Sequence, residues 1–544
     1  MKHLLPVLCV LLSILTVPVS IMAQINTNQM IRIGRNALYL EDYVMAIQHF
    51  NQVIKAKPYL AEPYLYRAIA KYSLDDFTGA ENDLTLCLER NPFLVQAYLC
   101  RGASRQNLGD YEKAIADYTQ GLKSLPEDKQ MLLNLSIAYA QTKQLDAALK
   151  NLDALLAYQP NYPQGYLARG SVYVEQGDTL QAFADYNKAL ELDKNQASGY
   201  AQRGMLYLQQ ENYAQALQDY NQAILLASDR GGYYINRGLI KYHLNDLRGA
   251  MADYDKVISM ETHNQLALYN RALLRSQVGD TYGAIDDFNK VIEWEPDNFM
   301  AMYNLALQNN EAKNYREAVA LLDKVLKEYP IFVPAYYARA ELKRKIGDLK
   351  GYDKDYWYAY DLEQKLQKQK AQGLVITGKT VLPAGTNLDE TAENGDDAAT
   401  TKTREKSDKN INKFNRLVVA DKIEEQQSKY TDELRGRVQD RDVTIELMPA
   451  FDLAGAAGNA NTAGNEKADF NRGYALNMQK DHAAAILAYT DAIQRNPEFA
   501  EAYYNRGLTH LYLGENELGI ADMSKAGELG VINAYSVIKK MTTE

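Results

Sequence analysis

The sequence predicts an all-α fold built from repeated helical hairpins, and three features that share one spacing support this prediction. An alanine recurs every 34 residues, nine times in succession: Ala46, Ala80, Ala114, Ala148, Ala182, Ala216, Ala250, Ala284 and Ala318. A large apolar or aromatic residue follows each alanine by four positions: Phe50, Leu84, Tyr118, Leu152, Tyr186, Tyr220, Tyr254, Phe288 and Leu322. A small residue precedes each alanine by twelve positions: Gly34, Ala68, Gly102, Ser136, Gly170, Gly204, Gly238, Ala272 and Ala306. Residues four apart on a helix face the same way, so each unit is predicted to be two closely packed helices.

Prolines mark the ends of many units, because proline cannot extend the helix before it. They stand twelve positions after the alanine at Pro58, Pro92, Pro126, Pro160, Pro296 and Pro330. This combination of small residue, alanine, bulky residue and proline resembles the tetratricopeptide repeat family. The resemblance covers residues 27–365 as about ten units, the last diverging at Tyr352, where alanine is expected. It implies a right-handed superhelical solenoid of antiparallel helix hairpins, in which each pair buries its apolar face against its neighbours.

Residues 1–23 differ from the repeats and predict a secretory signal peptide. Lys2 and His3 precede an apolar run, and the segment ends in a stretch that closes at Ala23, after which cleavage is predicted. An uncleaved anchor is the alternative. No later segment reaches the roughly 18 apolar residues that a spanning helix requires. We therefore expect a periplasmic or secreted protein whose contact with the membrane is through the signal peptide before cleavage.

Residues 366–465 interrupt the repeats and are predicted to be a partly disordered insert. Ala340 and Gly473 hold the same place in their units but lie 133 residues apart, whereas four repeats span 136. Residues 383–411 and 454–465 are predicted to be disordered and flexible, respectively. Residues 443–448 alternate between apolar and polar, and with residues 417–419 they predict a pair of short β-strands near 416–450. We expect this pair to dock on the solenoid or on a partner's sheet edge; a linker with accidental alternation is the alternative.

Residues 466–544 are predicted to hold two further repeats and a closing helix. The repeats are marked by Gly473, Ala485, Tyr489 and Pro497, and then by Gly507, Gly519 and Ala526. The closing amphipathic helix is predicted from Val531, Ile532, Tyr535, Val537 and Ile538. Two repeats are fewer than usually stand alone, so we expect them to stack on the end of the main array or to be completed by another chain.

Arginine and aspartate occur together 16 residues apart, which predicts partly buried structural ion pairs within the hairpins. The pairs are Arg67 with Asp83, Arg101 with Asp117, Arg169 with Asp185, Arg203 with Asp219, Arg237 with Asp253, Arg271 with Asp287, Arg339 with Asp355, and Arg506 with Asp522. Units that lack the arginine, at Ile33, Leu135 and Leu305, lack the aspartate too. Arg472 alone faces a neutral residue, Ala488. A motif copied eight times is not expected to be catalytic.

Composition and motifs argue against several functions. The net charge of -10 disfavours nucleic acid as a partner, because a phosphate-binding surface needs clustered Lys and Arg. The six histidines are scattered, no phosphate-binding loop or nucleophile motif is present, and Cys87 and Cys100 lack the spacing of zinc ligands. We therefore expect a protein that is not an enzyme and that uses no cofactor or metal.

One column of residues indicates where a partner would bind. Its members, again 34 apart, are Leu65, Leu99, Leu133, Leu167, Ala201, Ile235, Tyr269, Tyr303 and Tyr337. The resemblance places this column in the concave groove, where family members mostly bind peptides or protein segments. Tyrosine is enriched at binding hot spots, so Tyr269, Tyr303 and Tyr337 are the candidate groove, with Asn310 and Arg344 as anchors. The alternative is that these tyrosines pack against the next helix.

The expected function is therefore a non-enzymatic scaffold of the cell envelope that binds a protein or peptide partner. An envelope accessory factor that stacks carbohydrate on the tyrosines is the alternative.

Overall fold

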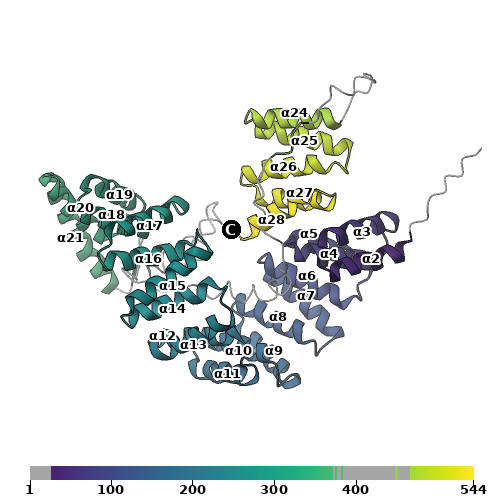
Figure 1. Cartoon of the computed structure of the whole chain (residues 1–544), viewed down its shortest axis with the longest axis horizontal. Helices are drawn as coiled ribbons and strands as arrows, with labels where there is room; N and C mark the ends of the chain where they lie inside the picture. The colour runs from purple at the N-terminus through teal and green to yellow at the C-terminus, as the bar shows by residue number, and fades with distance from the viewer. Residues whose placement is uncertain (1–25, 372–373, 377–380, 384–446, 451–465, 544) are drawn as a thin grey trace, which may run out of the picture. The chain divides into compact units, whose positions relative to one another are not determined.

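The computed structural model describes residues 26–371, 374–376, 381–383, 447–450 and 466–543 (Figure 1). These residues form 25 helices, which pair into antiparallel hairpins, and one two-stranded β-hairpin. The all-α solenoid predicted from the 34-residue spacing is confirmed. Within these ranges no helix is both long enough and apolar enough to cross a membrane. The predicted signal peptide, residues 1–23, lies outside them.

The main array contains twenty helices. They are α2 (Thr27–Tyr39), α3 (Tyr43–Ala56), α4 (Glu62–Ser73), α5 (Phe77–Arg90), α6 (Val95–Asn107), α7 (Tyr111–Ser124), α8 (Lys129–Gln141), α9 (Leu145–Tyr158), α10 (Pro163–Gln176), α11 (Thr179–Leu192), α12 (Ala197–Gln209), α13 (Tyr213–Leu226), α14 (Gly231–His243), α15 (Leu247–Met260), α16 (Gln265–Gln277), α17 (Thr281–Trp294), α18 (Phe299–Glu311), α19 (Tyr315–Glu328), α20 (Val333–Lys345) and α21 (Leu349–Ala371). The C-terminal repeats follow as α24 (Glu466–Met478), α25 (His482–Arg495), α26 (Ala500–Tyr512), α27 (Asn516–Glu528) and α28 (Asn533–Thr543). The even-numbered helices are the first helices of their hairpins.

The turn inside each hairpin combines a left-handed residue with a helix cap. Glu41 (φ 60°) and Gly109 (φ 82°) occupy this left-handed position in the first and third hairpins. The next residue often caps the second helix: the Asp42 carboxylate, for example, accepts a hydrogen bond from the Met45 amide at 3.0 Å. Short turns of this kind hold the two helices antiparallel.

The small residue of each unit lies directly against its bulky residue. A Cβ atom added at Gly34 would lie 2.7 Å from the Phe50 ring, and one at Gly238 would lie 2.7 Å from the Tyr254 ring. Three units with Ala or Ser at this place have leucine as the bulky residue: Ala68 with Leu84, Ser136 with Leu152, and Ala306 with Leu322. In these units the two columns compensate each other in volume, whereas Ala272 with Phe288 is an exception.

The chain divides into two compact units, with the boundary between α10 and α11. The first unit comprises residues 1–176 and 424–544, and the second comprises residues 177–423. The C-terminal repeats thus belong to the same unit as the N-terminal hairpins.

Within the first unit, the C-terminal repeats pack against the first hairpins of the main array (Figure 1). One apolar cluster contains residues from both ends of the chain: Ala37, Tyr43, Ala46, Ile47, Phe50 and Ala70 from α2 to α4, and Tyr504, Met523, Ala526, Ala534, Tyr535, Val537 and Ile538 from α26 to α28. The predicted closing helix is therefore α28, and Tyr535, Val537 and Ile538 are buried in this cluster. Val531 and Ile532 were wrongly assigned to that helix, because both precede its first residue, Asn533; Ile532 is also 56% exposed.

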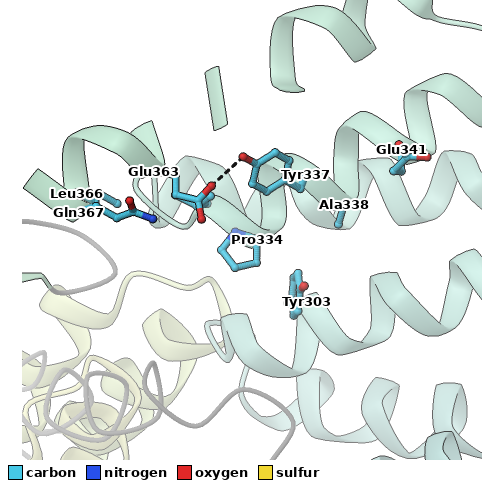
Figure 2. Close-up of a pocket in the computed structure, with 9 residues that line it drawn as sticks. Tyr303, Pro334, Tyr337, Ala338, Glu341, Glu363, Leu366 and Gln367 are labelled. Carbon is cyan, nitrogen blue, oxygen red and sulfur yellow. Dashed lines mark hydrogen bonds between the residues drawn. The ribbon is translucent and has the colours of Figure 1, made fainter. Parts of the chain in front are cut away.

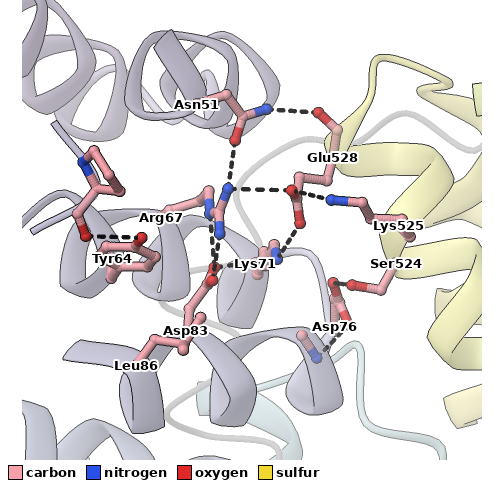
Figure 3. A network of polar contacts seen from close by, with 12 residues as sticks. Asn51, Tyr64, Arg67, Lys71, Asp76, Asp83, Leu86, Ser524, Lys525 and Glu528 are labelled. Carbon is pink, nitrogen blue, oxygen red and sulfur yellow. Dashed lines mark hydrogen bonds and ion pairs between the residues drawn. The ribbon is translucent and has the colours of Figure 1, made fainter. Parts of the chain in front are cut away.

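A buried polar network joins the same segments (Figure 3). Glu528 of α27 accepts from Lys71 Nζ at 3.1 Å and lies 3.2 Å from Arg67 Nη1, and both cations also contact Asp83. The Asn51 side chain donates to the Glu528 carbonyl at 2.6 Å. Lys525 also contacts Glu528, at 2.8 Å, so each carboxylate of the network is compensated by at least two cations, which is the condition under which burial of charge is tolerated. Burial alone would raise the pKa of the Glu528 carboxyl, but Lys71 and Arg67 outweigh it and lower that pKa to about 2.

A second buried contact lies beside the network. Ser524 Oγ donates to Asp76 Oδ2 at 2.5 Å, while the other carboxylate oxygen of Asp76 caps α5 through the Gly79 amide at 2.8 Å. Burial raises the pKa of the Asp76 carboxyl. A Cβ atom at Gly79 would lie 2.3 Å from both Ser524 Oγ and Asp76 Oδ2, so a side chain here would force this contact to shift.

The described strands lie elsewhere in the insert than predicted. β1 (Leu374–Ile376) pairs antiparallel with β2 (Val381–Pro383), with Val375 opposite Leu382. Of the predicted strand pair, residues 416–446 lie outside the described residues. Residues 447–450 form no strand, because the backbone of Met448 is hydrogen-bonded to the Asn505 side chain instead of to a second strand.

Candidate functional site

The structure brings seven of the predicted arginine and aspartate pairs together. In each, the arginine Nε and Nη2 donate to the two carboxylate oxygens at 2.5–3.0 Å. The pairs are Arg67–Asp83, Arg101–Asp117, Arg203–Asp219, Arg237–Asp253, Arg271–Asp287, Arg339–Asp355 and Arg506–Asp522. Every one of these aspartates is buried. Such two-point bonds are specific in geometry as well as charge-assisted, which suits a structural role.

The remaining predicted pair and the exception differ from these seven. Arg169 lies in the first unit and Asp185 in the second, so their pairing stays a prediction; Arg169 Nη1 contacts Asp153 at 2.7 Å. Arg472, which lacks the usual acid, contacts Asp491 at 2.7 Å and is half-exposed.

Two further kinds of partner of these pairs were missed in the sequence. The arginine Nη1 reaches back to the second helix of the preceding hairpin, as from Arg237 to Asn221 at 3.0 Å and from Arg271 to Asp255 at 2.7 Å. A second cation four residues after the arginine often contacts the same aspartate, as Lys241 does with Asp253 at 2.8 Å. Both partners recur at fixed offsets, 16 before and 4 after the arginine, so the spacing contained the signal. The result is a polar ladder that joins hairpin to hairpin.

The candidate groove tyrosines fall into two kinds. Tyr269 is 8% exposed, its ring meets Phe288 edge-on at 5.7 Å, and its hydroxyl accepts from Asn304 at 3.0 Å. Burial raises the pKa of the Tyr269 hydroxyl to about 12. Tyr303 is equally buried and packs against Phe332 at 5.2 Å. These contacts are those expected of core residues.

Tyr337 instead lines a pocket of about 660 Å³ between α18, α20 and α21 (Figure 2). The lining residues are Tyr303, Val333, Pro334, Tyr337, Ala338, Glu341, Glu363, Leu366 and Gln367. The Tyr337 hydroxyl donates to Glu363 Oε2 of α21 at 3.0 Å. Burial and this carboxylate raise the pKa of the Tyr337 hydroxyl to about 12. The pocket is therefore lined by apolar groups, by part of the Tyr303 side chain, and by the bonded polar groups of Tyr337 and Glu363.

The two predicted anchors do not line this pocket. Asn310 accepts from Lys345 Nζ at 2.7 Å, and exposed Arg344 is bound to Glu341 at 2.8 Å. Arg344 reaches the pocket only through Glu341, which is one of its lining residues.

A site in the C-terminal repeats was missed altogether. The side-chain amide of Asn505 on α26 binds the backbone of Met448 at both ends: its oxygen accepts from the Met448 amide at 2.7 Å, and its nitrogen donates to the Met448 carbonyl at 2.9 Å. Asparagine stands at this place, two before the small residue, in several first helices, at Asn134, Asn236, Asn270, Asn304, Asn471 and Asn505. This column has the same regular spacing as the tyrosine column and could have been found in the same way.

Comparison with known proteins identifies the class of protein that this fold and these columns define. Family models described as tetratricopeptide repeats match residues 108–171, 170–211, 202–262, 266–298, 300–330 and 470–527. The chain belongs to the tetratricopeptide repeat family. Members of this family are generally non-enzymatic scaffolds that bind protein or peptide partners.

Solved structures that resemble the chain are similar over part of it. A tetratricopeptide repeat protein from Parabacteroides merdae is 19% identical over 46% of this chain and 98% of its own, with a TM-score of 0.37. PilF of Pseudomonas aeruginosa is 18% identical over 37% of this chain and 92% of its own, with a TM-score of 0.35. YrrB, described as having an unusual peptide-binding site, is 20% identical over 34% of this chain and 95% of its own, with a TM-score of 0.30. No curated protein sequence matches the chain.

Proposed function

We propose that the chain is a protein-interaction scaffold that binds an extended segment of a partner protein in the pocket beside Tyr337. The pocket itself is the observation that carries this proposal. Its volume of about 660 Å³ is in the range of ligand sites, and its lining is mainly apolar with a few placed polar groups. An apolar side chain of the partner fills the space between Tyr303, Pro334 and Leu366, and the Glu363 carboxylate accepts a hydrogen bond from the partner's backbone or from a basic side chain.

The carbohydrate alternative gains no support from Tyr269 and Tyr303, two of the three tyrosines on which it was based. Stacking of sugars needs open aromatic faces. The Tyr269 and Tyr303 side chains are each 8% exposed, and their rings already pack against phenylalanines.

We also propose that the scaffold acts in the cell envelope, in the periplasm or outside the cell. The support is the charged, apolar and cleavable pattern of residues 1–23. Mass spectrometry of the protein from its native cell tests this proposal. A mature N-terminus at Gln24 supports export, and an intact Met1 terminus in the cytoplasmic fraction overturns it.

Site-specific crosslinking tests the pocket. A photoreactive amino acid at Ala338, which lines the pocket, is compared in native cells with one at exposed Lys324 on α19. A partner segment that attaches at 338 and not at 324 is then made as a synthetic peptide, and its affinity for the full chain is measured.

Tyr337→Ala is expected to lower the affinity of the chain for that peptide by more than about tenfold, as truncation of a hot-spot residue does. Tyr336→Ala is the matched control, because Tyr336 packs against Tyr358 and bonds the Pro330 carbonyl outside the pocket. Equal affinity of the Tyr337→Ala variant and the parent chain would overturn the proposal.

A further inference from the structure

The contact between Asn505 and Met448 has the form of a peptide bound to a receptor. A side-chain amide offers one donor and one acceptor, which match the carbonyl and the N–H of a single residue in an extended backbone. Asn505 is fully buried, and its side chain makes both of these hydrogen bonds to the backbone of Met448, at 2.7 and 2.9 Å. Its nitrogen also faces the Tyr489 hydroxyl at 3.5 Å, which helps to hold the amide in this orientation.

The Met448 side chain adds apolar contact to these two bonds. It packs at once against the cluster around Phe470, Tyr489 and Phe499 and against the cluster that contains Tyr504. The surface between α24 and α26 therefore accepts an extended backbone together with one long, flexible apolar side chain, a type of contact for which methionine is suited.

The segment that fills this surface has no regular secondary structure of its own. Residues 447–450 form no helix or strand, and Pro449 and Ala450 are exposed. The repeats on either side of the contact are complete hairpins, α24–α25 and α26–α27, and Met448 packs against the apolar clusters that they form. Met448 thus contributes to these clusters from outside the hairpins.

We propose that the surface of α24 and α26 around Asn505 is a second peptide-binding site, that residues 447–450 occupy it in cis, and that an extended partner peptide with a methionine-like anchor displaces them. The site lies in the first unit and is independent of the pocket beside Tyr337. An experiment can therefore refute the proposal for one site without affecting the proposal for the other. A tethered ligand acts at an effective concentration of the order of 1 mM, so the cis segment masks the site against partners present at micromolar levels.

Fluorescence anisotropy with a labelled peptide that has the sequence of residues 445–452 tests this proposal on the full chain. The parent chain is expected to bind the peptide weakly. Met448→Asp, which places a charge in the apolar site and releases the cis segment, is expected to bind it at least about tenfold more tightly. Adding Asn505→Ala to that variant is expected to remove the gain.

Asn304→Ala supplies the matched control, because Asn304 has the same helix position in the second unit and bonds Tyr269 instead of a backbone. Combined with Met448→Asp, it should leave peptide binding unchanged. Circular dichroism establishes that each variant is folded, and the milder Met448→Ala replaces Met448→Asp if the latter is not.

Hydrogen exchange on the parent chain provides a second measurement. Excess peptide should speed exchange of the Met448 amide, which loses its bond to Asn505 when it is displaced. Two results would show that residues 447–450 are a fixed structural contact. One is a folded Met448 variant that binds the peptide no more tightly than the parent chain. The other is a Met448 amide whose exchange rate does not change when the peptide is added.

Discussion

Replacing Arg203 with methionine should destabilise the second unit more than the same replacement at Arg237. Both arginines donate two hydrogen bonds to a buried aspartate, Asp219 or Asp253. Asp253 also accepts from Lys241 at 2.8 Å, whereas Tyr207 stands at the corresponding place beside Asp219. Among the residues that the structure describes, Arg203 is the cation that compensates the charge of Asp219.

The size of each loss in unfolding free energy depends on the charges that the variant leaves buried. Removing one partner of a buried ion pair costs about 3–5 kcal/mol, because the other charge stays buried. Lys241 retains a charge-assisted bond to Asp253 worth about 1.5–3 kcal/mol. We therefore expect a loss of about 4 kcal/mol for Arg203→Met and about 2 kcal/mol for Arg237→Met.

Urea unfolding of the full chain, followed by helicity at neutral pH, measures these losses. Asp219→Leu added to Arg203→Met should recover at least about 1 kcal/mol, because no charge then remains buried. The same cycle at Arg237 and Asp253 should also show coupling. Equal losses for the two arginines, together with no coupling in either cycle, would refute the structural role of the pairs.

Three more outcomes are expected. The pKa of Glu528 is lowered to about 2 in the folded chain, so its contribution to stability is present above about pH 4.5 and is lost as the pH falls toward 2. The stability difference between the parent and Glu528→Gln, about 3 kcal/mol at neutral pH, should shrink over that range in acid titrations of unfolding. Gly79→Ala should loosen the C-terminal repeats and raise their protease sensitivity, whereas Gly283→Ala, which has the same helix cap without a serine opposite it, should not. Burial raises the pKa of the thiols of Cys87 and Cys100 to about 11 and 12, so a thiol reagent at pH 8 should modify neither until urea is added.

The local architecture was predictable from the sequence because each hairpin repeats the same contacts. A volume pair such as Gly238 and Tyr254, or a charge pair such as Arg237 and Asp253, lies within one unit and therefore recurs at a fixed offset. Regular spacing reveals such pairs without any alignment. The strand prediction at 447–448 failed because alternation in a few residues cannot show that a side chain, here Asn505, takes the backbone bonds.

Features that depend on distant segments left no such signal. Tyr303 and Tyr337 hold the same helix position, but the Tyr337 hydroxyl bonds Glu363 of α21, a helix that runs on to residue 371 and is longer than the other second helices. The contact of Glu528 with Lys71 joins residues that are 457 positions apart and occurs once. A contact that occurs once has no period, and either residue alone resembles an ordinary surface charge.

The bond between Asp76 and Ser524 also sets a sequence of events during synthesis. The two residues are 448 positions apart, and chains grow at about 5–20 residues per second, so about 20–90 s pass before the partner of the first hairpins exists. During that interval α2 and α3 expose the apolar side chains that α26 to α28 later cover, and the two cations of α4 have Asp83 but not Glu528 as a partner. The surface of the first hairpins is therefore completed only when residues 448 positions further along the chain have been made.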